Sequence, residues 1–451
     1  MESVNMWMTV VARVTVALPC LALGCASLAT KAERRGGDAV TEWTLVADYY
    51  GSGNANWRTL AILQMAMHDA LNAAHPVYGR WWPAVAGEPA AEGANPDVAM
   101  AAAALEVLVL LHPEHEAETA TAFDTVMARY VDDASKEAGK RLGQAIGRAA
   151  VARRAHDGFV GTHFFPGDGA PGHWRPTPTL LATSRTNDIR PFLFAAVRDV
   201  PGLPPPMLAA PMYRQQLAET RSVGSLSSSE RTQAQTDDAF FWAHQSGQRG
   251  FVHLAVQLLA MHRPRGGVYA EARIMAQLTA ALADSAIITW NEKAEYSFWR
   301  PITAIRAEDG GASWTPLIET PPFPEYPSGH ATDCYVGAGV LEGALPDLAG
   351  PITYLSSAHM EPLAGPMRAE PATIYGMGQH AQSAPEDAPG GSERRFPSLT
   401  DAATNCARSR VWAGAHFWAA EVESQRIANI IVRRALGAVP EAAESGPVAS
   451  Q

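Results

Sequence analysis

The chain has 451 residues, of which 47% are hydrophobic and 18% are charged, a composition typical of a globular protein with a large core. Its formal net charge of −11 at pH 7 argues against nucleic acid or an anionic membrane surface as the main partner. A cluster of basic side chains in such a chain would therefore be a local, specific arrangement.

Residues 1–32 resemble an export signal. Arg13 precedes an apolar run at residues 14–23 that is too short to cross a bilayer, and small residues follow it. The segment Ser27-Leu28-Ala29 is one acceptable cleavage site. Residues 22–25 imperfectly resemble a lipoprotein cleavage box, which makes lipid attachment at Cys25 the alternative. Either way, we expect an exported protein, periplasmic or secreted, with no transmembrane helix in the mature chain.

The next part of the chain reads as helical. Apolar residues recur at spacings of three and four in four segments, the period of amphipathic helices. We interpret His68-Asp69, in the first of them, as a packing pair in the core rather than a catalytic pair. The Pro- and Gly-rich stretch 158–206 predicts a long ordered loop or a boundary between halves. The four segments are residues 60–74, 98–111, 120–130 and 138–155.

Helical patterns continue toward the C-terminus. Ser227 to Glu230 forms a capping-box pattern that predicts a helix through Trp242, and Ser398 to Asp401 predicts another helix start. Sustained alternation of apolar and polar residues is missing, so strands should be few. The predicted fold class is all-α, two packed helical bundles with long connecting loops. Three further helices are predicted: one at 268–290, one at 347–359, and a final one that runs through Gln425 to about Leu436. A loop is predicted at 361–396. The predicted parts are an N-terminal helical half at 40–206, a C-terminal half at 207–437 and a disordered tail at 438–451.

The stretch Pro321 to Gly329, followed by His330, carries four prolines interleaved with two aromatic residues. Proline fixes φ and removes a backbone donor, so this stretch predicts a rigid extended loop. The following residues predict a helix that begins at Ser328 or Gly329. A helix N-terminus presents free N–H groups and the positive end of a dipole, which together bind oxyanions. A proline-rich loop with an incidental histidine is the alternative on this segment alone.

Two further segments contribute charged side chains. Arg300 follows Lys293 by seven positions, two helical turns, although Pro301 disfavours an unbroken helix there. Arg410 and His416 are six positions apart and do not share a helix face, and Gly414 is a candidate break that would let them converge. Three cations with hydroxyl and backbone donors suit a tetrahedral or trigonal-bipyramidal oxyanion, and the histidines suit bonding to its central atom and proton transfer.

These three motifs, in this order and spacing, resemble those of the vanadium-dependent haloperoxidases, within the type 2 phosphatidic acid phosphatase superfamily. The stretch Thr59 to Ala74 also resembles an early helix of bacterial haloperoxidase-like proteins. The resemblance implies that His416 binds vanadium, that His330 is the acid-base residue and that Lys293 interacts with the bound peroxide. The implied ligands of the vanadate oxygens are Lys293, Arg300, Ser328, Gly329 and Arg410.

The function implied is oxidation of bromide, with chloride as a second candidate, by hydrogen peroxide to hypohalous acid. Trp290 and Phe323 occupy the places of the aromatic residues in the chloroperoxidase type, where they would shape a halide pocket, although core packing explains them equally well. A small organic acceptor and a homo-oligomer are compatible with this function. An exported acid phosphatase with a phosphohistidine at His416, and a non-catalytic oxyanion-binding protein, remain alternatives. Phosphate would compete with vanadate for the same ligands.

One position departs from the family pattern. The family usually has Asp four residues after the ligand histidine, where this chain has Ala420. Because that Asp orients the imidazole, His416 needs another acceptor.

The cysteines allow two interpretations. Cys334 and Cys406 each lie four residues from a motif residue, so a disulfide near the site and two free thiols are both open. No cysteine spacing supports a thiolate metal site.

Overall fold

The computed structural model describes residues 39–50, 56–159, 165, 167–176, 189–243, 247–348, 350–355 and 393–439. These residues belong to one compact unit that runs from residue 37 to residue 451. The expected export signal at residues 1–32 and residues 440–451 of the expected tail lie outside the described residues. The division into two halves stays a prediction.

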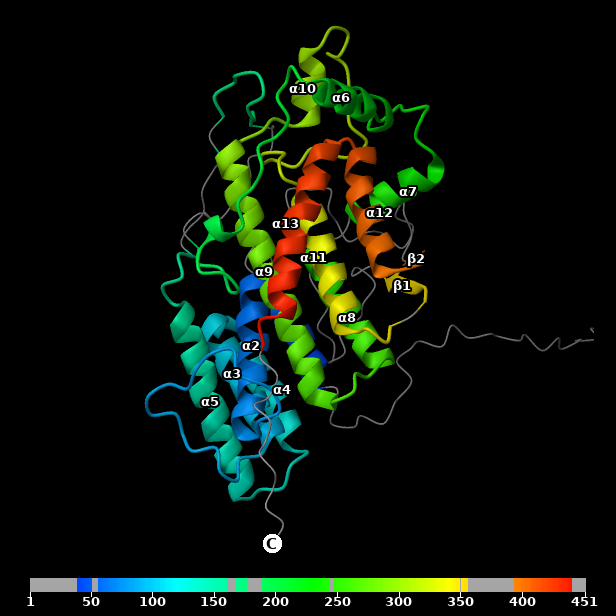
Figure 1. The fold of residues 1–451 in the computed structure, drawn as a ribbon. Coiled ribbons are helices and arrows are strands. Elements are labelled where there is room, and N and C mark those ends of the chain that lie inside the picture. The colour runs from blue at the N-terminus through cyan, green and yellow to red at the C-terminus, as the bar shows by residue number, and fades with distance from the viewer. Residues whose placement is uncertain are drawn as a thin grey trace, which may run out of the picture. The chain divides into compact units, whose positions relative to one another are not determined.

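Helices are the dominant regular structure of the described residues, as predicted, beside two short strands and long connecting loops (Figure 1). The α-helices are α1 (Ala39–Tyr50), α2 (Asn56–Ala74), α3 (Pro96–Leu111), α4 (Glu116–Met127), α5 (Ala134–Arg154), α6 (Pro211–Val223), α7 (Gln233–Ala243), α8 (Gly247–Met261), α9 (Gly267–Tyr296), α10 (Pro301–Ala307), α11 (Gly329–Ala344), α12 (Leu399–Trp412) and α13 (Trp418–Leu436). Short 3-10 turns occur at η1 (Pro113–His115) and η2 (Val197–Asp199), and the strands are β1 (Ile352–Leu355) and β2 (Glu393–Phe396).

Helix α9 connects the two groups of helices seen in Figure 1. It packs against α1 and α2 from the first part of the chain and against α8, α11 and α13 from the second. Most of its length is buried, and many of the buried positions are alanine, which allows neighbouring helices to approach closely. The helix that carries Lys293 is therefore held firmly on several sides.

Small residues also determine the packing of α3 against α5. Gly139, Gly143 and Gly147 recur every four residues and form one face of α5. A Cβ atom at Gly143 would lie 2.1 Å from the carbonyl oxygen of Ala99 in α3. Side chains at this face would therefore push the two helices apart.

The prediction of a helix at residues 347–359 is wrong for residues 350–355, which the structure describes. Residues 352–355 form β1, which pairs antiparallel with β2, so the loop predicted at 361–396 is also wrong at its end. Gly350 has a φ of +100° and Pro351 follows it, which together prevent a helix from continuing. The segment Ile-Thr-Tyr-Leu suits a strand, and Tyr354 is buried against Phe241 and Trp242.

Helix α7 begins later than predicted, at Gln233 rather than after Ser227. The capping box is formed by Thr232 and Gln235: the Thr232 Oγ1 accepts from the Gln235 N–H at 3.2 Å, and the Gln235 Oε1 accepts from the Thr232 N–H at 2.9 Å. Ser228 instead stabilises a turn by accepting from Arg231 N. The other predicted start, at Ser398, is confirmed because its Oγ accepts from Asp401 N at 3.0 Å.

Within the described ranges, no single helix has both the length and the hydropathy needed to cross a membrane. The pair formed by residues 96–111 and 113–127 passes that test only jointly, and it is bent by 120°.

His68 and Asp69 are fully buried, and Asp69 accepts hydrogen bonds from the backbone N–H groups of Trp81 and Trp82. The pair anchors the loop after α2, which agrees with the packing interpretation.

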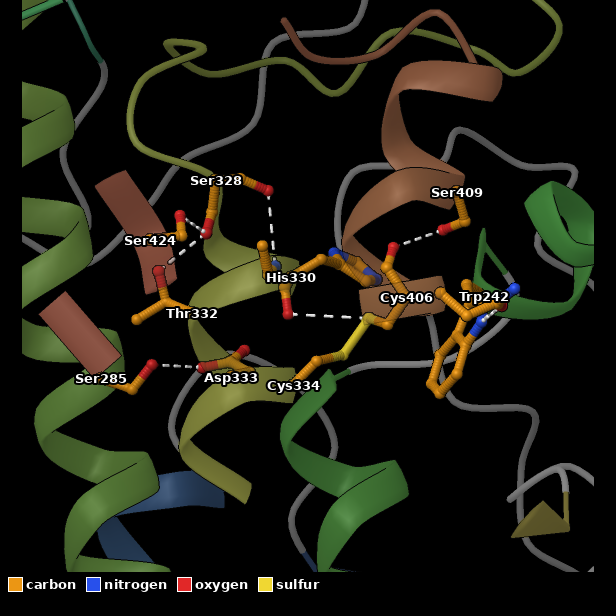
Figure 2. The surroundings of a disulfide bond; sticks show 12 residues. Trp242, Ser285, Ser328, His330, Thr332, Asp333, Cys334, Cys406, Ser409 and Ser424 are labelled. Carbon is orange, nitrogen blue, oxygen red and sulfur yellow. Dashed lines mark hydrogen bonds between the residues drawn. A yellow bond between two sulfur atoms is a disulfide. The ribbon is translucent and has the colours of Figure 1, made fainter. Parts of the chain in front are cut away.

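Cys334 of α11 and Cys406 of α12 form a disulfide (Figure 2). It joins the helix that begins beside His330 to the helix that ends beside Arg410. The sulfur of Cys406 also lies 3.8 Å from the carbonyl oxygen of His330. The structure thus favours the disulfide over two free thiols.

Removing this disulfide should destabilise the protein. It closes a sequence separation of 72 residues, and native disulfides typically contribute about 2–4 kcal/mol by restricting the unfolded chain. We expect the Cys334→Ala/Cys406→Ala variant to melt several degrees below the wild type. Reductant should lower the melting temperature of the wild type and leave the variant unchanged. Two more titratable thiols in the unreduced, unfolded wild type than in the variant would contradict the bond, since Cys20 and Cys25 are common to both.

Candidate active site

The proline-rich loop and the start of α11 form the floor of the site. Ser328 is the N-cap of α11, and its Oγ accepts from the backbone N–H of Ala331 at 3.4 Å. Its carbonyl oxygen accepts from the hydroxyls of Thr332 and Ser424, both at 2.8 Å (Figure 2). A Cβ atom at Gly329 would meet no atom within 4 Å. The predicted helix start is confirmed, and open space lies beside its N-terminus.

Lys293 and Arg300 are both fully buried but do not belong to one helix. Helix α9 ends at Tyr296, Ser297 adopts a left-handed conformation with a φ of +41°, and Arg300 is the N-cap of α10. The break expected from Pro301 is therefore real. Lys293 Nζ donates to the carbonyl oxygens of Pro324 and Glu325, both at 2.9 Å, and of Pro327. Lys293 thus holds the proline-rich loop in place, and contact with an anion would require one of these bonds to exchange.

Arg410 and His416 converge through a turn at Gly414, as the sequence suggested. Gly414 has a φ of +73°, and the carbonyl oxygen of Arg410 accepts from the N–H groups of Ala415 at 3.0 Å and His416 at 3.3 Å. A Cβ atom at Gly414 would lie 2.6 Å from the carbonyl oxygen of Gly224. Both the left-handed φ and the close contact therefore require glycine here.

The imidazole of His416 is held from two sides. Its Nδ1 lies 3.0 Å from Glu325 Oε1, which also accepts from the backbone N–H of Phe417 at 2.9 Å. Its Nε2 lies 3.0 Å from Arg300 Nη1. Because a guanidinium can only donate, this network assigns the lone pair to Nε2 and the proton to Nδ1. Nε2 therefore carries the lone pair, and a ligand could use it once the hydrogen bond from Arg300 is exchanged.

Glu325 supplies the acceptor that Ala420 cannot supply. It is fully buried in the proline-rich loop, five positions before His330, whereas the family pattern places the acceptor on the helix after the ligand histidine. Sequence reasoning missed this residue. The available signal was an acidic residue in an otherwise apolar loop.

Burial dominates the protonation of the site. Desolvation lowers the pKa of Arg300 to about 9 and that of Arg410 to about 10. It also lowers the pKa of Lys293 and of His416 well below their ordinary values, with the charge of Arg300 the next largest cause for both. His416 is therefore neutral at pH 7, the form in which Nε2 binds a metal or attacks an electrophile.

Two buried carboxyl groups lie among these cations. Desolvation raises the pKa of Glu325 to about 7, although Arg300 and Lys293 oppose this change. It also raises the pKa of Glu421, which Arg410 opposes. Three guanidinium nitrogens, Arg300 Nη2 and Arg410 Nε and Nη1, are buried with no hydrogen-bond partner among the described residues, as are three carboxyl oxygens of Glu325 and Glu421. The nitrogens are donors that an added anion could use.

One pocket brings most of the predicted site residues together. Arg300 and Ser328 do not line it, but Arg300 contacts His416 and Ser328 caps α11 directly before Gly329. The rings of Trp290 and Phe323 meet edge to face with centroids 4.8 Å apart. The predicted residues that line the pocket are Trp290, Lys293, Phe323, Gly329, His330, Arg410 and His416.

Comparisons with known proteins identify this part of the chain. Residues 273–444 match the family described as the VCPO second helical-bundle domain. Residues 273–444 are therefore a VCPO-type domain. It contains Lys293, Arg300, His330, Arg410 and His416, so the resemblance drawn from the three motifs is confirmed.

Curated and solved relatives agree with the VCPO-type assignment. The vanadium chloroperoxidase of Curvularia inaequalis is 30% identical over 135 residues, which are 24% of this chain and 22% of that protein. A bacterial vanadium-dependent iodoperoxidase superposes with a TM-score of 0.66 at 19% identity, covering 88% of this chain and 94% of its own. The holo-type bacterial vanadium-dependent chloroperoxidase gives 0.62 at 16% identity, with 90% and 96% covered. These structures confirm the all-α helical-bundle fold.

The contact between Glu325 and His416 in the VCPO-type domain leads to a binding prediction. Glu325→Ala should weaken orthovanadate binding by about 10- to 100-fold, because loss of a residue that orients a histidine ligand of a metal has effects of that size. Glu325→Gln should bind nearly as well as the wild type, since its amide oxygen still accepts from Nδ1. Isothermal titration calorimetry measures both. Equal affinity for Glu325→Ala and the wild type would remove this role from Glu325.

Proposed function

We propose that this protein is a vanadate-dependent haloperoxidase that oxidises bromide with hydrogen peroxide to hypobromous acid, with chloride as a second candidate substrate. The observation that carries the proposal is the convergence of His416 Nε2 with three unpartnered guanidinium nitrogens of Arg300 and Arg410 beside the start of α11. Such a donor set fits vanadate, whose oxygens need several donors and whose metal accepts one nitrogen.

Each part of the site has a distinct task in holding vanadate. Arg300 and Arg410 would bind its oxygens with the nitrogens that have no partner, and the backbone of Gly329 and the hydroxyl of Ser328 would donate at the helix N-terminus. His416 Nε2 would bind the metal, with its ring oriented by Glu325. Bound vanadium supplies Lewis acidity without a change of oxidation state.

His330 is placed to move protons in this pocket. It follows Gly329 directly, lines the pocket and is partly exposed, unlike the buried His416. A partly exposed imidazole can exchange protons with solvent, so His330 would accept a proton as peroxide binds. Lys293 donates three hydrogen bonds to carbonyl oxygens of the proline-rich loop. These bonds would hold the loop in place and would position the ammonium group of Lys293 next to the peroxide.

The aromatic pair favours a peroxidase over a phosphatase. Trp290 and Phe323 give the pocket an apolar wall, and Phe323 lies 4.8 Å from the guanidinium of Arg300 and 5.4 Å from the ammonium of Lys293. An apolar surface next to cations suits a weakly hydrated halide. A neutral His416 would equally suit attack on phosphorus, so phosphate-ester hydrolysis is the second candidate, and phosphate the competing occupant.

The proposed setting follows from the N-terminus. Residues 1–32 support activity outside the cytoplasm, either periplasmic or secreted, with Cys25 as a site for a lipid anchor. Hydrogen peroxide and halide are the proposed partners, and a small organic acceptor would be halogenated by the product.

The test compares two reactions on protein freed of metal and phosphate. Bromination of a 1,3-diketone with peroxide and bromide should require orthovanadate and should fall by at least about 100-fold in His416→Ala, since loss of a direct ligand exceeds loss of its orienting partner. His262→Ala, which changes an exposed histidine at the end of α8, is the matched control and should keep full activity.

Hydrolysis of an aryl phosphate is measured beside it. Hydrolysis that vanadate inhibits, without bromination, would replace the peroxidase by a phosphatase. Tight vanadate binding with neither reaction would leave a non-catalytic oxyanion-binding protein.

A further inference from the structure

The wall of the pocket formed by α8 and the facing parts of α9 and α11 contains a carboxyl group that the oxyanion site does not use. Asp333 lies three positions after His330 on α11, so the two side chains share one helix face. Its Oδ1 accepts from Ser285 Oγ at 2.6 Å and from Gln248 Nε2 at 3.4 Å. All four residues line the pocket that Lys293, Arg410 and His416 also line. Figure 2 shows Ser285 pointing to Asp333 on the turn of α11 that follows His330.

Ser285 and Gln248, which donate hydrogen bonds to Asp333, are both neutral, and three cationic or titratable groups on the neighbouring helices bind elsewhere. Lys293 of α9 binds the proline-rich loop. Arg249 and His253 of α8 both pair with Asp48 of α1, at 2.8 and 2.7 Å. Asp284 of α9 accepts from the N–H groups of Phe192 and Leu193, and Glu423 of α13 pairs with Arg426. The titratable groups of the oxyanion site next to this wall are Glu421, Arg410, His416 and His330.

A carboxyl group at this position matters for an anionic substrate. An ionised carboxylate in a partly desolvated pocket repels a halide, whereas a protonated carboxyl is neutral and can donate a hydrogen bond to it. Burial raises the pKa of Asp333 to about 7, and the bonds from Ser285 and Gln248 only partly oppose this. Both forms are therefore populated near neutral pH.

We propose that Asp333 determines when this pocket admits a halide: its protonated form allows halide to bind, and its ionised form excludes it. The proposal rests on the proposed function, because it takes halide as the substrate. It assigns to Asp333 a role in specificity and none in the oxidation itself.

The direction of the pH effect follows from the protonation of an acid. Below pH 7, Asp333 is mostly neutral and the KM for bromide should be low and constant. Above pH 7, the neutral fraction falls about tenfold per pH unit, so the KM for bromide should rise by up to about tenfold per unit. The KM for hydrogen peroxide should not rise with pH in this way, because hydrogen peroxide is neutral in this pH range.

The first experiment measures the KM for bromide from pH 5.5 to 8.5 in the vanadate-loaded protein. Asp333→Asn, which keeps the size and the acceptor for Ser285, should show a constant KM. Asp284→Asn is the matched control, because Asp284 is a buried carboxyl whose pKa is likewise raised to about 7 but which does not line the pocket. Asp284→Asn should show the same increase in the KM for bromide above pH 7 as the wild type. A rise that persists in Asp333→Asn would overturn the proposal.

Ser285→Ala provides a second variant that keeps the carboxyl. Ser285 stabilises the ionised form of Asp333, so its removal should raise the pKa further and move the increase in KM to higher pH. A shift to lower pH, or no shift, would contradict the mechanism.

A second experiment is independent of catalysis. The protein is saturated with inorganic phosphate, which occupies the oxyanion site, and quenching of Trp290 fluorescence by iodide is measured against Trp290→Phe as the background. The apparent Kd of iodide should rise above pH 7 in the wild type and stay constant in Asp333→Asn. A pH-dependent Kd of iodide in both the wild type and Asp333→Asn, or in neither of them, would overturn the proposal. If bromination fails but this difference appears, the peroxidase assignment fails and the role of Asp333 in anion entry stands.

Discussion

The burial of three cations in one small region is the constraint on which the site depends. Lys293 and Arg300 are fully buried and Arg410 is 2% exposed. Burying a charge costs free energy unless hydrogen bonds and opposite charges offset it. Lys293 donates hydrogen bonds to backbone carbonyls of the proline-rich loop. The nearby carboxyl group of Glu421 raises the pKa of Arg410 and so favours its charged form. The proposed oxyanion site rests on the guanidinium nitrogens that have no hydrogen-bond partner among the described residues.

The proline-rich loop has two functions in this arrangement. Its backbone carbonyl oxygens accept hydrogen bonds from Lys293 and from Arg300, whose Nε donates to the carbonyl oxygen of Phe323 at 2.8 Å. Its Glu325 side chain orients His416. In this chain the orienting carboxyl group thus lies in the loop before His330 and not on the helix after His416. A rigid loop can take this task because its prolines restrict the backbone.

The two walls of the pocket differ in chemistry. Trp290 and Phe323 form an apolar wall, whereas Asp333, Ser285 and Gln248 form a polar one. Helix α9 contributes to both, since Ser285 and Trp290 lie on it, and it packs against helices from both parts of the chain. The disulfide adds a covalent link between α11 and α12.

What the sequence by itself determined is local: helix positions from apolar periodicity, the cap at Ser328, the break at Gly414, and three motifs whose order and spacing indicated the family. These features depend on neighbouring residues, so short-range rules suffice. The strand at Ile352–Leu355 lay beyond such rules, because its partner is distant in the chain. The same holds for Glu325 beside His416 and for the contacts of Ser285 and Gln248 with Asp333. Only tertiary packing decides which acidic side chain meets which histidine, because that choice depends on helix ends and loops brought together across the fold.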